Sequence, residues 1–335
     1  MKTQPAISLP QGVRDILPEE AKSIVRIEAQ ILSVFERYGF KMVLTPLLEY
    51  VDVLSLGMGE NLKDKVLKFI DPSTGKVIAI RPDITPQIAR VAATRMRDYP
   101  LPLKLCYNES VIRCHESRDG KSSEVRQAGA EYISSASSPE ADAEMITMAI
   151  VALKETGLRA FKVDIGDVGF LRAVINGLGL ETADQKRVKD AIAIKDSSSL
   201  EAILEGFSKK VNKDDKKLLL NLTAFYGEDE VIKKAAAVTK NKTALGSLEN
   251  LRQVIDIIGK NGFKDCITVD LGEVRGFDYY TGVIFEGFAA GVGKAILGGG
   301  RYDNLMERYG SPLAATGFAF NVENIIAALG RNPAP

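Results

Sequence analysis

The stretch EVRGFDYYTGVIFEGF, residues 273–288, places an arginine, an aspartate and two adjacent tyrosines directly before a run of strand-forming residues. The motif GGGRYD follows at 298–303. Charged and polar aromatic side chains are costly to bury without partners. The pattern therefore predicts either an internal salt-bridge network or a polar pocket that receives a ligand.

Three earlier segments carry similar charge at strand or loop positions, namely IRPDITPQ at 80–87, VIRCHE at 111–116 and EVRQAGAEY at 124–132. In the last, Gln127, Gly129 and Glu131 share one strand face because side chains alternate, and a glycine there would leave room above the sheet for a ligand. Arginines could hold a carboxylate and acidic groups an ammonium, while tyrosine and glutamate bond a polar side chain. Such a set fits an amino acid better than a phosphate or a sugar.

Other chemistries find few suitable residues in this sequence. His115 is the single histidine, so a histidine base has one candidate and a histidine-rich metal site is excluded. Cys106, Cys114 and Cys266 form no C-x-x-C pair, which indicates reduced thiols. The glycines of ILGGGRYD lack phosphate-loop spacing and indicate a close-packed strand against which a ligand lies. We expect neither a metal site nor a cofactor.

Composition limits the classes of partner. The chain has 44 basic and 44 acidic side chains, so its formal net charge is zero. This argues against nucleic acid as a main partner, because phosphate binding usually leaves a basic excess. The N-terminal segment has no signal-like apolar stretch, and no run of 18 apolar residues occurs anywhere. We expect a cytoplasmic protein that does not enter a membrane.

Periodicity and turn residues predict the elements that must hold these side chains. The expected helices before residue 170 cover 19–38, 86–97 and 138–153, with a hairpin at 65–83 and strands at 101–117, 124–134 and 160–167. Lysine and alanine then rise through several short helical patterns at 170–262, which predicts a helical insertion. Strand patterns return at 266–274, 282–289 and 294–300, before a last helix at 320–330. We therefore predict an α+β core, residues 1–169 and 263–335, whose mainly antiparallel sheet is flanked by helices.

Several segments carry a family resemblance. In chain order, LPQGVRDILPEEA, YGFKMVLTPLLEY, IRPDITP, VRGFDYYTGVIFE and GGGRYDNL resemble the catalytic domain of histidyl-tRNA synthetases, which are class II aminoacyl-tRNA synthetases. The likeness covers about residues 8–327. It implies a class II synthetase fold and a pocket for histidine.

The resemblance also implies which residues surround that histidine. Asp83 and Thr85 would meet the α-ammonium, and Gln127 and Arg113 would lie by the carboxylate. Arg275 would lie beside the carboxylate and activated phosphate, and Glu131, Tyr280 and Tyr302 would surround the imidazole. Tyr279 is the last implied member of the histidine-binding set.

The chain departs from the synthetases where those enzymes hold ATP. GKSSEV stands in place of a loop with two arginines and an aromatic residue. In GFAFNVENI, Asn324 replaces the arginine that holds the ATP tail and Asn321 replaces a glycine. Loss of a cation that stabilises a transferring phosphoryl group costs about 10³-fold in comparable sites. We also expect no anticodon-binding domain, since the chain stops at Pro335.

A histidine pocket without ATP-binding residues resembles the regulatory subunits of ATP phosphoribosyltransferase, and RPDITPQIAR supports that branch. The resemblance implies a non-catalytic subunit, needed by a short-form catalytic subunit at the first step of histidine biosynthesis and involved in feedback control by histidine. It further implies a homodimer, formed through the first helix and the following strand, within a hetero-octamer. The alternative is a truncated synthetase paralogue that still makes histidyl-adenylate; a tRNA-binding remnant fits the neutral charge less well.

Overall fold

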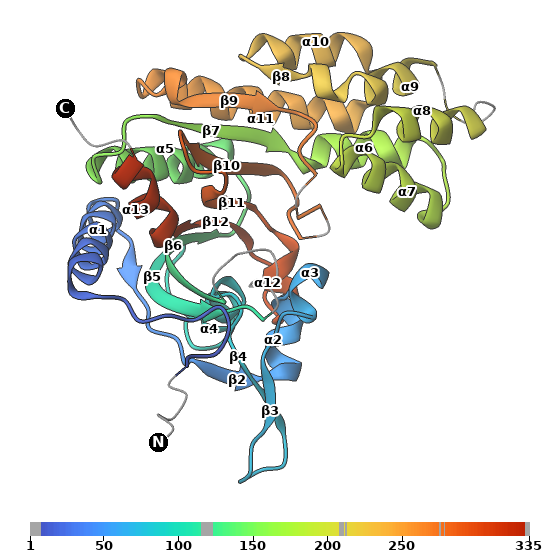
Figure 1. The fold of residues 1–335 in the computed structure, drawn as a ribbon. Coiled ribbons are helices and arrows are strands. Elements are labelled where there is room, and N and C mark those ends of the chain that lie inside the picture. Colours follow the sequence, from blue (N-terminus) through green and yellow to red (C-terminus); the bar gives the residue numbers. More distant parts are fainter. Residues whose placement is uncertain are drawn as a thin grey trace, which may run out of the picture.

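A nine-stranded mixed sheet forms the centre of the protein (Figure 1). The computed structural model describes residues 8–114, 123–207, 211, 213–274, 276–277 and 279–331. The strands of the large sheet are β1 (Lys41–Met42), β5 (Leu103–Ile112), β6 (Glu124–Ser134), β7 (Phe161–Asp167), β8 (Tyr226–Gly227), β9 (Ile267–Asp270), β10 (Val283–Ala289), β11 (Ala295–Arg301) and β12 (Ala314–Asn321). Their order is β1-β5-β6-β12-β11-β10-β7-β9-β8.

The sheet is antiparallel in its middle and parallel near both sides. Pairing is antiparallel from β5 to β7, whereas β1 runs parallel to β5 and β9 runs parallel to β7. The sheet is therefore mainly antiparallel, as expected, but it is mixed because it contains two parallel pairs. The parallel pairs join strands separated by long stretches of chain, as parallel connections require.

Helices cover both faces of the sheet. α1 (Pro18–Arg37), α5 (Pro139–Glu155) and α13 (Val322–Arg331) pack together on one face, against β6 and β12. α4 (Thr85–Thr94) and α12 (Asn304–Arg308) contact each other, and their apolar residues join those of β5 and β6 in a separate core on the other face.

Strand β6 shows how the sequence sorts its residues between these two faces. Ala128 and Ala130 belong to the core under α1 and α5, whereas Val125 and Ile133 belong to the core under α4. Because strand side chains alternate, the odd-numbered residues between Val125 and Ile133 all face α4.

A small second sheet of order β2-β4-β3 lies beside this core. Its strands are β2 (Leu48–Tyr50), β3 (Lys68–Ile70) and β4 (Val77–Ile80), and the short helices α2 (Val51–Gly57) and α3 (Glu60–Lys63) follow β2. The β3–β4 hairpin projects away from the body of the protein (Figure 1). This is the hairpin expected at 65–83.

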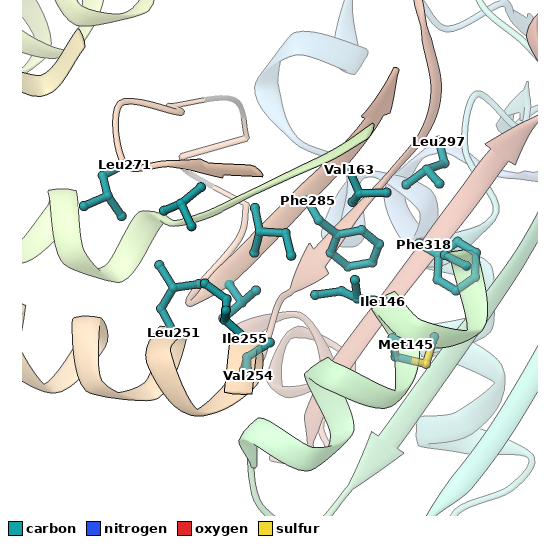
Figure 2. Close-up of a cluster of buried hydrophobic side chains, with 14 of the residues drawn as sticks. Met145, Ile146, Val163, Leu251, Val254, Ile255, Leu271, Phe285, Leu297 and Phe318 are labelled. Carbon is teal, nitrogen blue, oxygen red and sulfur yellow. The ribbon is translucent and has the colours of Figure 1, made fainter. Parts of the chain in front are cut away.

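The region predicted as an insertion is mostly helical, yet it also completes the large sheet. Its helices are α6 (Val168–Gly177), α7 (Thr182–Ala193), α8 (Ser197–Gly206), α9 (Lys213–Leu220), α10 (Glu230–Val238) and α11 (Lys242–Lys260). Strand β8 lies within it and pairs with β9 at the sheet edge. Apolar residues of α11 such as Leu251 and Ile255 share a core with Val163 of β7 and Phe285 of β10 (Figure 2). Because β8 and α11 join this region to the sheet and its core, the predicted domain boundaries at 170 and 262 stay a prediction.

In the C-terminal region, the sequence analysis missed one strand and misplaced both ends of one helix. Strand β12, the centre of the sheet, was not predicted, and the helix expected from residue 320 begins only at Val322. That helix also continues through Gly330 to Arg331 rather than stopping at the glycine. Within the described part of the chain, no helix combines the length and apolar character needed to cross a membrane.

Candidate functional site

A cavity of about 270 Å³ opens on the α4 face, over β6, β11 and β12. Predicted ligand residues found in its wall are Asp83, Thr85, Arg113, Gln127, Tyr279, Tyr280 and Tyr302. The volume is close to the lower end of the range for small-molecule sites, about 300 Å³. Arg275 and His115 lie outside the described residues, so their predicted roles stay predictions.

These side chains come from five separate places in the chain. Asp83 and Thr85 stand at the turn into α4, and Arg113 directly follows β5. Gln127 lies on β6, while Tyr302 directly follows β11. Tyr279 and Tyr280 belong to the segment between β9 and β10. Only the folded sheet brings them to one cavity.

Glu131 lies beneath the cavity rather than in its wall. Its side chain is 1% exposed, and its carboxyl group accepts hydrogen bonds from the Tyr302 hydroxyl and, at 2.7 Å, from Thr85 Oγ1. Tyr107 OH lies 3.4 Å from the same oxygen that Thr85 contacts. Since Thr85 and Tyr302 both line the cavity, they connect the buried carboxyl group to any ligand.

Two glycines make space for this arrangement. Gly317 faces Glu131 in the β6–β12 register, and a Cβ atom at Gly317 would overlap Glu131 Oε2. A Cβ atom at Gly129 would overlap the ring of Tyr107 on β5. The expectation that Gly129 leaves room for a ligand is therefore wrong, because Tyr107 fills that space. Neither Tyr107 nor Gly317 was predicted, since tyrosine and glycine in strand-like segments gave no signal of their own.

Burial shifts the protonation of both carboxyl groups. Desolvation raises the pKa of Glu131 to about 8, although the hydroxyl donors of Tyr302 and Thr85 oppose the shift. Desolvation also raises the pKa of Asp83, and the positive charge of Arg113 works against this. Each carboxyl group therefore resists carrying a negative charge until a cation or further donors reach it.

The cavity wall is aromatic and contains polar atoms without protein partners. The rings of Tyr279 and Tyr280 have centroids 5.1 Å apart, and those of Tyr279 and Tyr302 lie 5.6 Å apart. Gln127 Oε1 and the Tyr279 hydroxyl oxygen are buried and have no hydrogen-bond partner among the residues that the structure describes. Buried polar groups are normally satisfied, so these two atoms indicate a site that a polar ligand completes.

Two of the four polar residues in IRPDITPQ belong to an internal network instead. Arg81 forms an ion pair of 2.6 Å with Glu109 and also donates to Thr45. Gln87 donates to Glu49 and accepts from Thr45, which closes the network. The alternative of a buried salt-bridge network was thus right for Arg81 and Gln87, whereas Asp83 and Thr85 reach the cavity.

The arginine of GGGRYD also has a structural role. Arg301 is buried and contacts both carboxylate oxygens of Asp142, at 3.0 and 2.8 Å, and Asp303 at 3.0 Å. Gly299 packs against the backbone of β12, where a Cβ atom would overlap. A Cβ atom at Gly298 would meet only open space, and Gly298 lines the cavity. The expected close-packed glycine strand is therefore present at Gly299, and its neighbour Gly298 borders the cavity.

A second cavity of about 720 Å³ adjoins the first and shares Arg113 and Asn321 with it. Two of the arginines that line it have anionic partners: Arg14 pairs with Glu20, and Arg126 pairs with Glu28. Asn324 donates to the carbonyl of Ala295, and Asn321 accepts from the Asn324 backbone. The two asparagines noted in the sequence therefore support the backbone here.

The histidyl-tRNA synthetase family model matches residues 12–325. Curated relatives have a more specific name. The ATP phosphoribosyltransferase regulatory subunit of Geobacter sulfurreducens is 48% identical over 326 residues, which is 97% of this chain and 74% of that protein. The protein of that name from Clostridium botulinum is 38% identical over 321 residues, 96% of this chain and 76% of its own length.

Solved structures agree with these sequence matches. An ATP phosphoribosyltransferase regulatory subunit/histidyl-tRNA synthetase from Bacillus halodurans superposes with a TM-score of 0.89 at 31% identity, over 98% of this chain and 84% of that chain. Histidyl-tRNA synthetase from Nostoc superposes with a TM-score of 0.82 at 21% identity, over 98% of this chain and 76% of that chain. The second likeness concerns the fold alone.

Proposed function

Because this chain belongs to the ATP phosphoribosyltransferase regulatory subunits, a histidyl-tRNA synthetase-like family, we propose that it senses histidine for a catalytic partner. It is the regulatory subunit of a transferase complex in histidine biosynthesis. The cavity under α4 is the sensor, and the short-form catalytic subunit carries out the phosphoribosyl transfer. Its proposed role is feedback control of the first step of histidine biosynthesis, in the cytoplasm.

The observation that carries this proposal is the composition of the cavity. It combines Asp83 for an ammonium, Arg113 for a carboxylate, and Tyr302 over Glu131 for a polar ring. Gln127 Oε1 and the Tyr279 hydroxyl supply polar atoms that lack protein partners. Free histidine offers all three matching groups in one small molecule.

We further propose that the chain itself catalyses no adenylation. The second cavity supports this, because Arg14 and Arg126 are engaged with Glu20 and Glu28 and would have to leave those partners to hold a triphosphate. The test is pyrophosphate exchange by the purified protein with histidine and ATP. Exchange well above background would instead favour a truncated synthetase paralogue.

Assembly is the third part of the proposal. Met42 on edge strand β1 and Leu44, Leu47 and Leu48 after it are all exposed. Exposed apolar residues at a sheet edge usually mark an interface. We assign this surface to a homodimer, which would bridge catalytic dimers in a hetero-octamer without tRNA.

The decisive experiment is an activity assay of the complex with the short-form catalytic subunit, with and without histidine. Coupling between distinct sites is typically about 1–3 kcal/mol, so histidine should lower activity roughly 5- to 150-fold. Asp83→Asn should reduce that ratio towards one, because it removes a carboxylate from the cavity wall. Asp256→Asn, an exposed change on α11, should keep the wild-type ratio. Equal histidine sensitivity in all three proteins would reject this cavity as the sensor.

A further inference from the structure

The walls around Glu131 are suited to a cation. Three tyrosine rings, of Tyr279, Tyr280 and Tyr302, gather at the cavity. Two carboxyl groups, of Asp83 and Glu131, lie beside and beneath it. Aromatic faces attract a cation within about 6 Å of the ring centroid, and carboxylates do so more strongly.

The described hydrogen-bond partners of Glu131 are all hydroxyl groups, from Tyr302, Thr85 and Tyr107. A hydroxyl group can either donate or accept, so it can bond a carboxylate or a carboxylic acid after a simple rotation. Backbone amides or arginines can only donate, so they would favour the ionised form. The surroundings of Glu131 can therefore accommodate both of its protonation states without movement of the chain.

We propose that the cavity binds the ring of its histidine ligand as an imidazolium cation, and that Glu131 supplies the proton through the Tyr302 hydroxyl. This rests on histidine being the ligand, as proposed above. This inference adds two points to that proposal: the charge state of the bound ring and the residues that determine this charge state.

The proton transfer is balanced within the site. In the unliganded protein the proton resides on the Glu131 carboxyl group, whose pKa burial raises to about 8. On binding, the Tyr302 hydroxyl gives its hydrogen to the ring nitrogen and receives the hydrogen of Glu131. The end state is a carboxylate that accepts from Tyr302, which in turn accepts from the ring N–H. The Tyr302 hydroxyl and Glu131 Oε2 are already in hydrogen-bond contact, so a hydrogen can pass between them.

Titratable groups face Glu131 from the elements packed around it. They are Tyr107 from β5, Asp83 from the turn before α4, Tyr302 after β11, and Tyr279 from the segment between β9 and β10. Burial raises the pKa of each tyrosine well above its usual value, so all three stay neutral. On β12, Gly317 adds no side chain. Asp83 adds a second negative charge that favours a cation in the cavity.

The test is nitrogen NMR of histidine labelled with ¹⁵N in its ring, bound to the protein at pH 7.5, where a carboxyl group with a pKa of about 8 is still mostly protonated. Free imidazole, with a pKa of about 6.5, is only about 9% protonated there. We expect both ring nitrogens of the bound ligand to show the protonated type of chemical shift. A bound ring with one protonated and one bare nitrogen would overturn the inference and leave the histidine-sensing proposal standing.

Variants separate the role of Glu131 from general effects on the fold. In Glu131→Gln and Tyr302→Phe the bound ring should be neutral, because the proton source or its connection is removed. Tyr226→Phe, at the far edge of the sheet, should keep the wild-type spectrum. A protonated ring in Glu131→Gln would refute the assigned donor. Absence of any histidine binding by the wild-type protein would instead refute the histidine-sensing proposal, and this inference with it.

Discussion

Glu131 and Gly317 face each other across β6 and β12, and each limits what the other can be. Gly317 has no side chain, and Glu131 Oε2 occupies the position where a Cβ atom would stand. Among the described residues, the hydrogen-bond partners of this buried carboxyl group are hydroxyl groups. At the residue scale, the proposed sensing site depends on an absent side chain as much as on the polar ones.

Gly317→Ala should therefore displace Glu131 and damage the site. Overpacking of this kind typically costs about 1–3 kcal/mol of unfolding free energy, and histidine binding should weaken along with it. Calorimetric titration and urea unfolding would measure the two effects. Gly246→Ala on α11 is the control, because a Cβ atom there meets nothing within 4 Å and alanine favours helices. Normal histidine binding by Gly317→Ala would contradict the assigned geometry.

Glu131 should also make stability depend on pH. Its folded pKa, about 8 because of burial, lies above its unfolded value of about 4.3. Between these values the folded state holds more protons, so its contribution to stability is present at low pH and lost as the pH rises towards 8. The limit is about 1.4 kcal/mol per pH unit. Urea unfolding at pH 5.5 and 8.0 should show a smaller difference for Glu131→Gln than for wild type; equal differences would argue against a protonated Glu131.

At the scale of elements, helix α11 joins the insertion to the sheet. Asn241 caps its N-terminus by accepting from the backbone N–H groups of Thr243 and Ala244, at 3.0 and 3.1 Å. The same side chain donates to the carbonyl of Ala173 on α6 at 2.8 Å. One residue thus fixes the start of α11 and its position against α6.

Asn241→Ala should lower the unfolding free energy by about 1–2 kcal/mol, the usual cost of a lost helix cap. Asn241→Asp keeps the accepting oxygen and should lose less. Urea unfolding followed by circular dichroism gives both values. Histidine affinity should stay unchanged, because Asn241 is not among the residues of the cavity wall. An alanine variant as stable as wild type would show that the cap contributes nothing.

There is a physical reason why the sequence analysis missed the central strand β12. Strand β12, AATGFAFN, is central and lies between β6 and β11. Most of its residues are buried on both faces, so it lacks the alternation of polar and apolar residues that marks a half-exposed strand. The hairpin of β3 and β4 was predicted correctly because its turn residues are explicit in the sequence.

At the scale of the whole molecule, two strongly exposed apolar residues lie on different surfaces of the protein. Leu44 is 78% exposed beside the edge strand β1, whereas Ile194, 74% exposed, lies in the insertion. Because the two residues are similarly exposed but have different surroundings, Ile194 can serve as the control for Leu44. Only Leu44 continues into the apolar group with Leu47 and Leu48.

Leu44→Asp should weaken the homodimer by placing a charge in an apolar contact, while Ile194→Asp should leave it intact. Light scattering after size-exclusion chromatography would report the mass of each variant. Circular dichroism would check that both variants keep their helices. An intact dimer with Leu44→Asp would move the interface away from β1.

The sequence by itself determined the family, the α+β core and most of the side chains that meet in the cavity, because these are properties of residue type and order. The residue pattern alone could not separate Asp83 from Arg81, since both occur in one charged segment. The family resemblance named Asp83, and the fold places Asp83 in the cavity wall and Arg81 beside Glu109. Tertiary structure likewise decided that Tyr107 fills the space at Gly129 and that Glu131 lies beneath Thr85 and Tyr302. Those facts depend on the register between β5, β6 and β12, which pairs residues far apart in the chain and which no local pattern encodes.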